Sequence, residues 1–204
     1  MPGRFPTGLI AAAIAAITVA ACSPVGERTS LSVGYYSLSG RSFSELDRQI
    51  NIHGPRVGGY GKALAATSVR MVPEFRFAEA NGQCRVESAH VKVQAHVTLP
   101  RLANGANLRS ELSKAWTDLE EYARQHEAVH VSIADRHALN AERVLAGLPP
   151  ERDCQAMRAS AQTTWRLLLA SHEREQLQFD ENEKGRIAEL VEKSRQADLA
   201  SAAR

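Results

Sequence analysis

Hydrophobic and polar residues follow two different periods along the chain, and the change between them divides it into halves. From Arg85 to Leu99 apolar and polar residues alternate, as in a strand with one buried face. The apolar positions in this stretch are Val91, Val93, Ala95, Val97 and Leu99. Beyond Pro100 the period becomes helical, and neither proline nor glycine interrupts the chain from Asn107 to Leu145. The pattern therefore predicts strands in the first half and long helices in the second.

Shorter signals complete the predicted element order. The sequence predicts a strand over 31–38, a short helix from Ser42 or Ser44 to about residue 52, and a second strand over 63–77. Asn81-Gly82 is a hairpin signal between that strand and the alternating one. Asn107 or Ser110 is the candidate cap of the long helix. A further helical region begins near residue 152, reaches at least residue 178, and ends in a charged, alanine-rich stretch. The predicted fold class is α+β, with a small antiparallel sheet packed on a pair of long helices.

The amino terminus has the form of an export signal. Arg4 precedes an apolar run from Leu9 to Ala21 that is too short to span a membrane. The run closes with Val-Ala-Ala-Cys at 19–22, which resembles the bacterial lipoprotein signal, so Cys22 would be the lipid-modified first residue of the mature chain. We therefore divide the chain into a signal peptide (1–21), a tether (22–30), one domain (31–185) and a charged helical tail (186–204). An ordinary signal peptide with a soluble product is the alternative.

Charge and cysteine content narrow the compartment and the partners. A net charge of +2 with no basic run does not favour nucleic acid as a partner, so we expect none. Apart from Cys22, the remaining cysteines are Cys84 and Cys154, and an isolated pair in an exported protein predicts a disulfide.

The motif with the strongest chemical meaning is His126-Glu127-Ala128-Val129-His130, an H-E-x-x-H inside the long predicted helix. Residues four apart lie on one face of a helix, so the two imidazoles can bind one metal ion. In zinc peptidases this arrangement holds zinc, while the glutamate is a general base rather than a ligand. His126 and His130 are therefore the predicted zinc ligands and Glu127 the predicted catalytic base. Two hydrogen-bonded core histidines are the alternative.

A catalytic zinc site needs a third protein ligand and an open position for water. Asp135 and Glu142 point away from His126 on the helix. The second helical region offers better candidates on its apolar stripe and near the edge of that stripe. By chemistry these are His172 and Asp180, and the residues alone leave both open.

The order of features resembles a bacterial family of secreted proteins of unknown function that are usually described as predicted zinc-dependent proteases. The matching pieces are Tyr35-Tyr36, Ser39-Gly40, Glu45-Leu46, Gly54-Pro55, Ala66-Thr67, Cys84-Arg85-Val86, Leu99-Pro100 and Trp116, followed by the H-E-x-x-H motif. Members commonly carry Tyr-Asp-x-x-Thr-x-His-Gly near the end, and the run here is 179–185. The run here is one residue shorter than that element. Asp180 matches the aspartate, and with a one-residue gap after it Gly185 matches the glycine, so that Lys184 stands where members have histidine. The resemblance implies a zincin-like helix pair and zinc held by His126, His130 and Asp180, with His172 as the alternate third ligand.

Together these features predict a zinc-dependent metallohydrolase of the bacterial cell envelope, most simply a peptidase. We expect a lipid-anchored protein on the periplasmic side of a membrane, with peptide or protein substrates. The strand over 85–99 is a candidate edge for binding an extended peptide. Tyr122 and His172 are candidate oxyanion helpers. The alternative function is a catalytically inactive envelope lipoprotein that works as a binding or scaffolding module.

Overall fold

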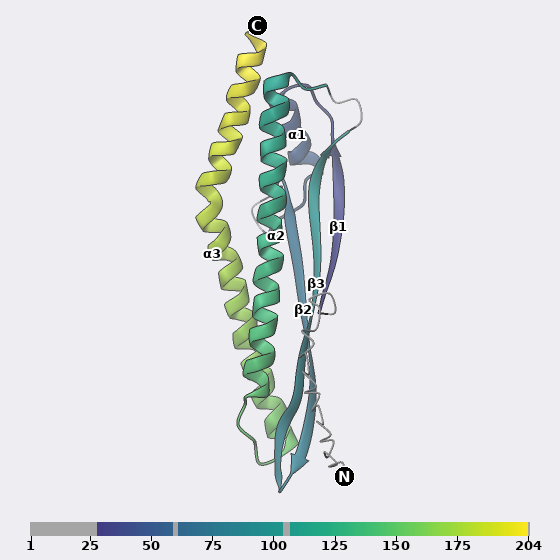
Figure 1. The fold of residues 1–204 in the computed structure, drawn as a ribbon, viewed down its shortest axis with the longest axis vertical. Coiled ribbons are helices and arrows are strands. Elements are labelled where there is room, and N and C mark those ends of the chain that lie inside the picture. The colour runs from purple at the N-terminus through teal and green to yellow at the C-terminus, as the bar shows by residue number, and fades with distance from the viewer. Residues whose placement is uncertain (1–27, 59–60, 104–106, 204) are drawn as a thin grey trace, which may run out of the picture.

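The structure is a computed structural model that describes residues 28–58, 61–103 and 107–203 (Figure 1). The predicted signal peptide, Cys22 and most of the tether lie outside the described residues. The described elements, in chain order, are β1 (Thr29–Leu38), α1 (Phe43–His53), β2 (Ala66–Ala80), β3 (Gln83–Leu102), α2 (Ser110–Ala146) and α3 (Cys154–Ala202). The α+β fold class is confirmed, since α2 and α3 run side by side along one face of the sheet (Figure 1).

The three-stranded sheet has the order β1-β3-β2 and is mixed rather than wholly antiparallel. The β2 and β3 strands form an antiparallel hairpin whose turn residues, Asn81 and Gly82, have φ angles of 54° and 73°. These positive angles suit the tight hairpin turn predicted from Asn-Gly. By contrast, β1 pairs with β3 in parallel, from Thr29 opposite Val93 to Leu38 opposite Leu102. The strand proposed as a peptide-binding edge is therefore the central strand, and that prediction is wrong from Val93 onward, where β1 and β2 are hydrogen-bonded to both of its edges.

The alternating residues of β3 face the helices, as the pattern predicts. Val91 and Val93 are fully buried against alanines of α2, including Ala134 and Ala138, and against Met157 of α3. Small alanine side chains let the α2 backbone approach the strand closely, so the valine side chains fill the space between the two elements. This packing fixes the orientation of α2 about its own axis and determines which α2 residues face α3.

A second apolar cluster lies at the other end of the helix pair. Its buried members are Leu38, Leu46, Trp116 and Leu119, from β1, α1 and α2. Leu190 and Val191 of α3 pack against the same cluster, so α3 continues as a packed helix through Gly185 and ends at Ala202. No helix in the described part of the chain is both long and apolar enough to cross a membrane.

The helix ends differ in how they are capped. Asp153 caps α3, where its side chain accepts a hydrogen bond from the Ala156 backbone N–H. The N-cap of α2 is Arg109, which makes no side-chain capping bond. The prediction of Asn107 or Ser110 as this cap is therefore wrong. Packing of buried Leu112, Ala115 and Trp116 in the first turns determines where α2 begins instead.

The predicted disulfide is confirmed and ties the sheet to the helices. Cys84 and Cys154 are bonded, with their Cα atoms 4.9 Å apart. Two backbone hydrogen bonds of 2.8 Å between Cys84 and Glu151 reinforce the junction. Because Cys84 lies near the start of β3 and Cys154 at the start of α3, the bridge anchors the first turn of α3 to the hairpin.

Candidate metal centre

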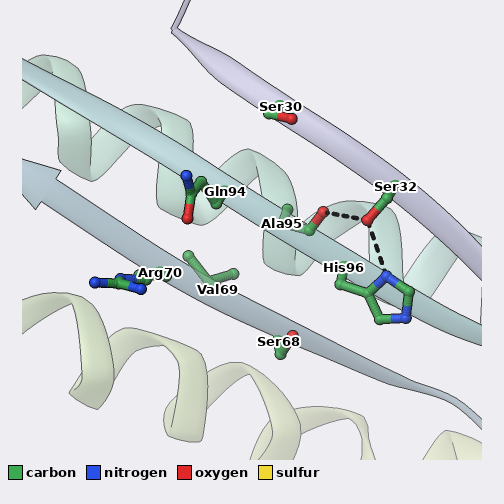
Figure 2. A pocket seen from close by; sticks show the side chains of 8 residues that line it. All are labelled: Ser30, Ser32, Ser68, Val69, Arg70, Gln94, Ala95 and His96. Carbon is green, nitrogen blue, oxygen red and sulfur yellow. Dashed lines mark hydrogen bonds between the residues drawn. The ribbon is translucent and has the colours of Figure 1, made fainter.

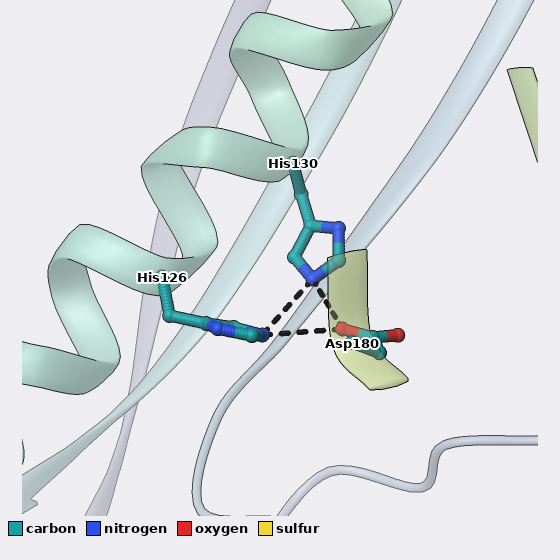
Figure 3. A group of neighbouring side chains, drawn as sticks. All are labelled: His126, His130 and Asp180. Carbon is teal, nitrogen blue, oxygen red and sulfur yellow. Dashed lines mark hydrogen bonds and ion pairs between the residues drawn. The ribbon is translucent and has the colours of Figure 1, made fainter. Parts of the chain in front are cut away.

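The two motif histidines lie one turn apart on α2 and point toward α3, as Figure 3 shows. Their Nε2 atoms are 3.2 Å apart. Asp180 approaches from α3, and its Oδ1 lies 3.2 Å from Nε2 of His126 and 2.9 Å from Nε2 of His130. Among the described residues these three side chains form a group that could hold a metal ion. The structure therefore brings together the two histidines and one of the two candidate third ligands.

The spacing of these three atoms fits a small tetrahedral ion. Zinc ligands at 2.0 to 2.2 Å from the metal in tetrahedral geometry lie about 3.3 to 3.6 Å from one another. The three observed separations, between 2.9 and 3.2 Å, lie a few tenths of an ångström below this range. Two imidazole nitrogens and a carboxylate oxygen are also donors that zinc prefers. The residues present therefore fit zinc, both in chemistry and in geometry.

The site is closed on its inner side and open on its outer side. The side chains of His126 and His130 are 9% and 12% exposed, whereas that of Asp180 is 43% exposed. Phe179 covers the histidines, with its ring stacked on His126 at 4.7 Å and edge-on to His130 at 5.1 Å. A fourth coordination position facing the exposed side of Asp180 would be accessible to water.

Glu127 is buried beside this group and accepts a hydrogen bond from a residue of the sheet. The residue is 5% exposed, and its Oε2 accepts a hydrogen bond of 2.7 Å from Oγ1 of Thr67 on β2. Burial raises the pKa of the Glu127 carboxyl, while the Thr67 hydrogen bond and the two nearby histidines oppose that rise. A buried carboxyl group with a raised pKa, next to a possible metal site and outside its ligand set, has the properties of a general base.

His172, the alternate third ligand, does not join the group. Its Nε2 lies 2.8 Å from Nε2 of Gln176, and its ring packs 5.4 Å from that of His137. Burial, followed by the nearby His137, lowers the pKa of His172, which favours the neutral imidazole. His172 is therefore part of the α2–α3 interface beside the metal group.

Tyr122, the other candidate oxyanion helper, is engaged elsewhere. Its hydroxyl donates a hydrogen bond of 2.6 Å to Oε2 of Glu183, and its ring centroid lies 5.9 Å from that of His126. Burial and the hydrogen bond to Glu183 raise the pKa of Tyr122. The hydroxyl would have to leave Glu183 before it could contact a substrate.

Two neighbours of the group, Thr67 and Gln176, are not predicted as site residues from the sequence. Thr67 is 60 residues away from Glu127 along the chain, and a threonine in a strand gives no signal of its own. Gln176 lies one turn before Asp180 on the predicted apolar stripe of α3, and this position is a signal that could have identified it.

A separate hollow of about 330 Å³ lies over the outward-facing side chains of the sheet (Figure 2). In it, Oγ of Ser32 lies 2.8 Å from Nδ1 of His96. His96 is exposed, in agreement with the alternating pattern that placed it on the polar face of the strand. The hollow is lined by Ser30, Ser32, Ser68, Val69, Arg70, Gln94, Ala95 and His96.

Comparison with known proteins identifies a family. Residues 33–186 match the family described as "Bacterial protein of unknown function (DUF922)". No curated protein and no solved structure matches the chain. Because the match covers most of its length, the chain belongs to this family, and the metal group lies within the matched region.

Proposed function

We propose that this protein is a zinc-dependent metallohydrolase of the bacterial cell envelope that cleaves peptide bonds. The observation that carries the proposal is the convergence of His126 Nε2, His130 Nε2 and Asp180 Oδ1 within 3.2 Å, beside the buried Glu127. Three protein ligands with one accessible position are the ligand set of a catalytic zinc site, whereas structural sites are closed by four.

Each side chain has a distinct part in this chemistry. Zinc, when bound, supplies a Lewis acid that polarises a carbonyl group and makes water more acidic. Glu127 takes the proton from the attacking water and passes it to the leaving amine. Thr67 holds the Glu127 carboxylate in place through its 2.7 Å hydrogen bond. Phe179 keeps water away from the inner side of the histidine pair.

The compartment is part of the same proposal. The Cys84–Cys154 disulfide is consistent with export, since such bonds persist in oxidising compartments. We propose that Cys22 carries the lipid anchor and holds the protein on the periplasmic side of a membrane, where peptide or protein substrates reach the exposed side of Asp180.

The second candidate function is an inactive envelope lipoprotein that serves as a binding or scaffolding module. Lys184 favours it, because the resemblance to the predicted protease family implies a histidine before the glycine, whereas Lys184 pairs with Glu181. The burial of Glu127 opposes it, because a binding module has no use for an expensive buried carboxyl group at this point.

The first experiment measures zinc content in the purified mature protein and three variants. We expect about one zinc per chain in the unchanged protein and in Glu127→Gln, since that residue is not a ligand. Asp180→Ala should lose most of the metal, whereas Glu181→Gln, an exposed neighbour on the same helix, should keep it. Absence of zinc from the unchanged protein after metal loading would overturn the proposal.

Peptide hydrolysis is tested separately on a mixed peptide substrate pool. The zinc-loaded protein should cleave it, and Glu127→Gln should retain zinc but lose cleavage by on the order of a hundredfold or more. If both proteins bind zinc fully but do not differ in peptide cleavage, the result would favour the inactive module.

A further inference from the structure

Gln176 connects the metal group to the histidine behind it. Its Oε1 lies 2.6 Å from Nδ1 of His130, on the opposite side of that ring from the metal group. Its Nε2 lies 3.1 Å from the backbone carbonyl oxygen of His130 and 2.8 Å from Nε2 of His172. Gln176 also lies one helical turn before Asp180 on α3, so one helix supplies both a ligand and this contact.

The orientation of the Gln176 amide follows from these three contacts. A backbone carbonyl only accepts hydrogen bonds, so the amide end facing the His130 carbonyl must be the NH₂ group. The second N–H of that group points to Nε2 of His172, which accepts it. The end left facing Nδ1 of His130 is then the oxygen, which cannot donate. Nδ1 of His130 must therefore carry the proton.

The proton position on His130 decides what its other nitrogen can do. A neutral imidazole has one donor and one acceptor nitrogen, so a proton on Nδ1 leaves a free lone pair on Nε2. That lone pair faces Oδ1 of Asp180 at 2.9 Å, and the carboxylate oxygen is also an acceptor. Two acceptors this close favour a cation between them. This is the tautomer in which a histidine can bind a metal through Nε2.

The arrangement has a cost that falls on His172. Because His172 accepts at Nε2, its own proton must lie on Nδ1, which is buried and has no hydrogen-bond partner among the described residues. A buried donor without a partner destabilises the fold. The amide is therefore held in an orientation that suits His130 rather than His172.

We propose that Gln176 is a positioning residue that locks His130 in the Nδ1–H tautomer and thereby sets the metal affinity of the site. The metal-affinity part rests on the proposed function, but the tautomer exists with or without metal. His126 lacks a corresponding hydrogen bond, since its Nδ1 is buried without a partner among the described residues. Its ring packs on Phe179 instead. His130 is therefore the motif histidine whose coordinating nitrogen is selected by a hydrogen bond.

The test uses two substitutions of Gln176 and one control. Gln176→Met has a similar length but cannot hydrogen-bond in the same way, whereas Gln176→Glu keeps an acceptor for Nδ1 of His130. Gln178→Met makes the same chemical change at an exposed position on α3. Circular dichroism and thermal unfolding establish that each variant is folded before it is used.

The first readout is the histidine tautomer in metal-free protein, measured by nitrogen NMR of ring-labelled histidine at alkaline pH. The unchanged protein and Gln176→Glu should show His130 protonated at Nδ1, and Gln176→Met should show a substantial Nε2–H population. His130 protonated at Nε2 in the unchanged protein would overturn the proposal, even if no variant folds.

The second readout is zinc affinity, measured by competition with a chromophoric chelator. Loss of such a hydrogen bond to a ligating histidine lowers metal affinity by about 10- to 100-fold, so we expect that drop in Gln176→Met. Gln176→Glu should restore binding to within a few-fold, and Gln178→Met should match the unchanged protein. Equal affinities in Gln176→Met and the unchanged protein would refute the role in metal binding. If the unchanged protein binds no zinc, the proposed function fails, and the tautomer measurement still decides the assignment of Gln176.

Discussion

Thr67→Val removes one hydroxyl group from the contact between β2 and Glu127. The Thr67 hydroxyl donates a 2.7 Å hydrogen bond to Oε2 of Glu127, which is only 5% exposed. Hydrogen bonds to charged groups contribute about 1.5 to 3 kcal/mol, and burial denies Glu127 a replacement donor from water. We therefore expect Thr67→Val to lower the free energy of unfolding by about 2 kcal/mol.

Thr67→Ser is the matched control, because it keeps the hydroxyl and removes only a methyl group. Thr67→Ser should lower the free energy of unfolding by about 1 kcal/mol. This loss is smaller than that of Thr67→Val, although serine is less apolar than valine. Both are measured by urea unfolding of metal-free protein. In a Glu127→Leu background the cost of Thr67→Val should fall to that of losing the weaker 3.3 Å contact from the Thr67 hydroxyl to the backbone carbonyl of residue 127, so the difference isolates the side-chain contact.

The same pair of variants tests the catalytic role of Glu127. If Thr67 orients the base and the full 2 kcal/mol is lost from the transition state, Thr67→Val should lower the rate of hydrolysis by up to about 30-fold. Its zinc affinity should be nearly unchanged. Equal stability of the valine and serine variants would refute the contact. A loss of zinc as large as that in Asp180→Ala would show that Thr67 serves the metal ligands and not the base.

Three further predictions address the surroundings of the site. Replacing Cys84 and Cys154 with alanine should lower the free energy of unfolding in urea by about 4 kcal/mol, because the bridge closes a loop across a sequence separation of 70. A hydrogen bond from a backbone N–H of α3 lowers the pKa of Asp153. The ionised Asp153 therefore stabilises the fold above the unfolded pKa of about 3.9, and this stabilisation is lost as pH falls through the folded pKa. Asp153→Asn keeps the cap without this dependence, so the stability of the unchanged protein relative to this variant should be lower at pH 2.5 than at pH 6. Phe179→Leu should weaken zinc binding about 2- to 10-fold in chelator competition, since aromatic contacts contribute about 0.5 to 1.5 kcal/mol.

The local elements of this fold could be predicted because their signals are local. The Asn81-Gly82 turn and the alternation along β3 each depend on residues that are adjacent in the chain. The parallel pairing of β1 could not be predicted, because α1 and β2 separate β1 from β3 along the chain. No periodic pattern specifies which free edge of a hairpin a distant strand will choose.

The same division holds at the site. His126 and His130 are recognisable because four-residue spacing places them on one face of a helix. The candidates for the third ligand could be narrowed to Asp180 and His172, but the choice between these two depends on how α2 and α3 are placed against each other. That placement depends on the packing of α2 alanines against β3 valines. The hydrophobic pattern of the sequence does not show which of these side chains meet.

Lys184 does not remove a ligand from this chain. Since α3 is helical through Gly185, residue 184 lies one turn beyond Asp180, and its side chain pairs with Glu181. Asp180 already reaches both motif histidines, so the three-ligand set is complete without residue 184. Lys184 therefore does not prevent this group from holding a metal ion.

Glu127 provides the argument that separates the two candidate functions. Its carboxyl group is 5% exposed, and burial raises its pKa against the hydrogen bond from Thr67 and the field of two histidines. An apolar residue of similar size would pack between α2 and β2 without that penalty, so Glu127 makes the fold less stable than it could be. A scaffold gains nothing from this, whereas a general base needs a carboxyl group with a raised pKa beside the metal. The prediction that separates the two functions is that Glu127→Leu is more stable than the unchanged metal-free protein in urea unfolding, while peptide hydrolysis is lost. A Glu127→Leu protein that is less stable would make the residue structural and favour the binding module.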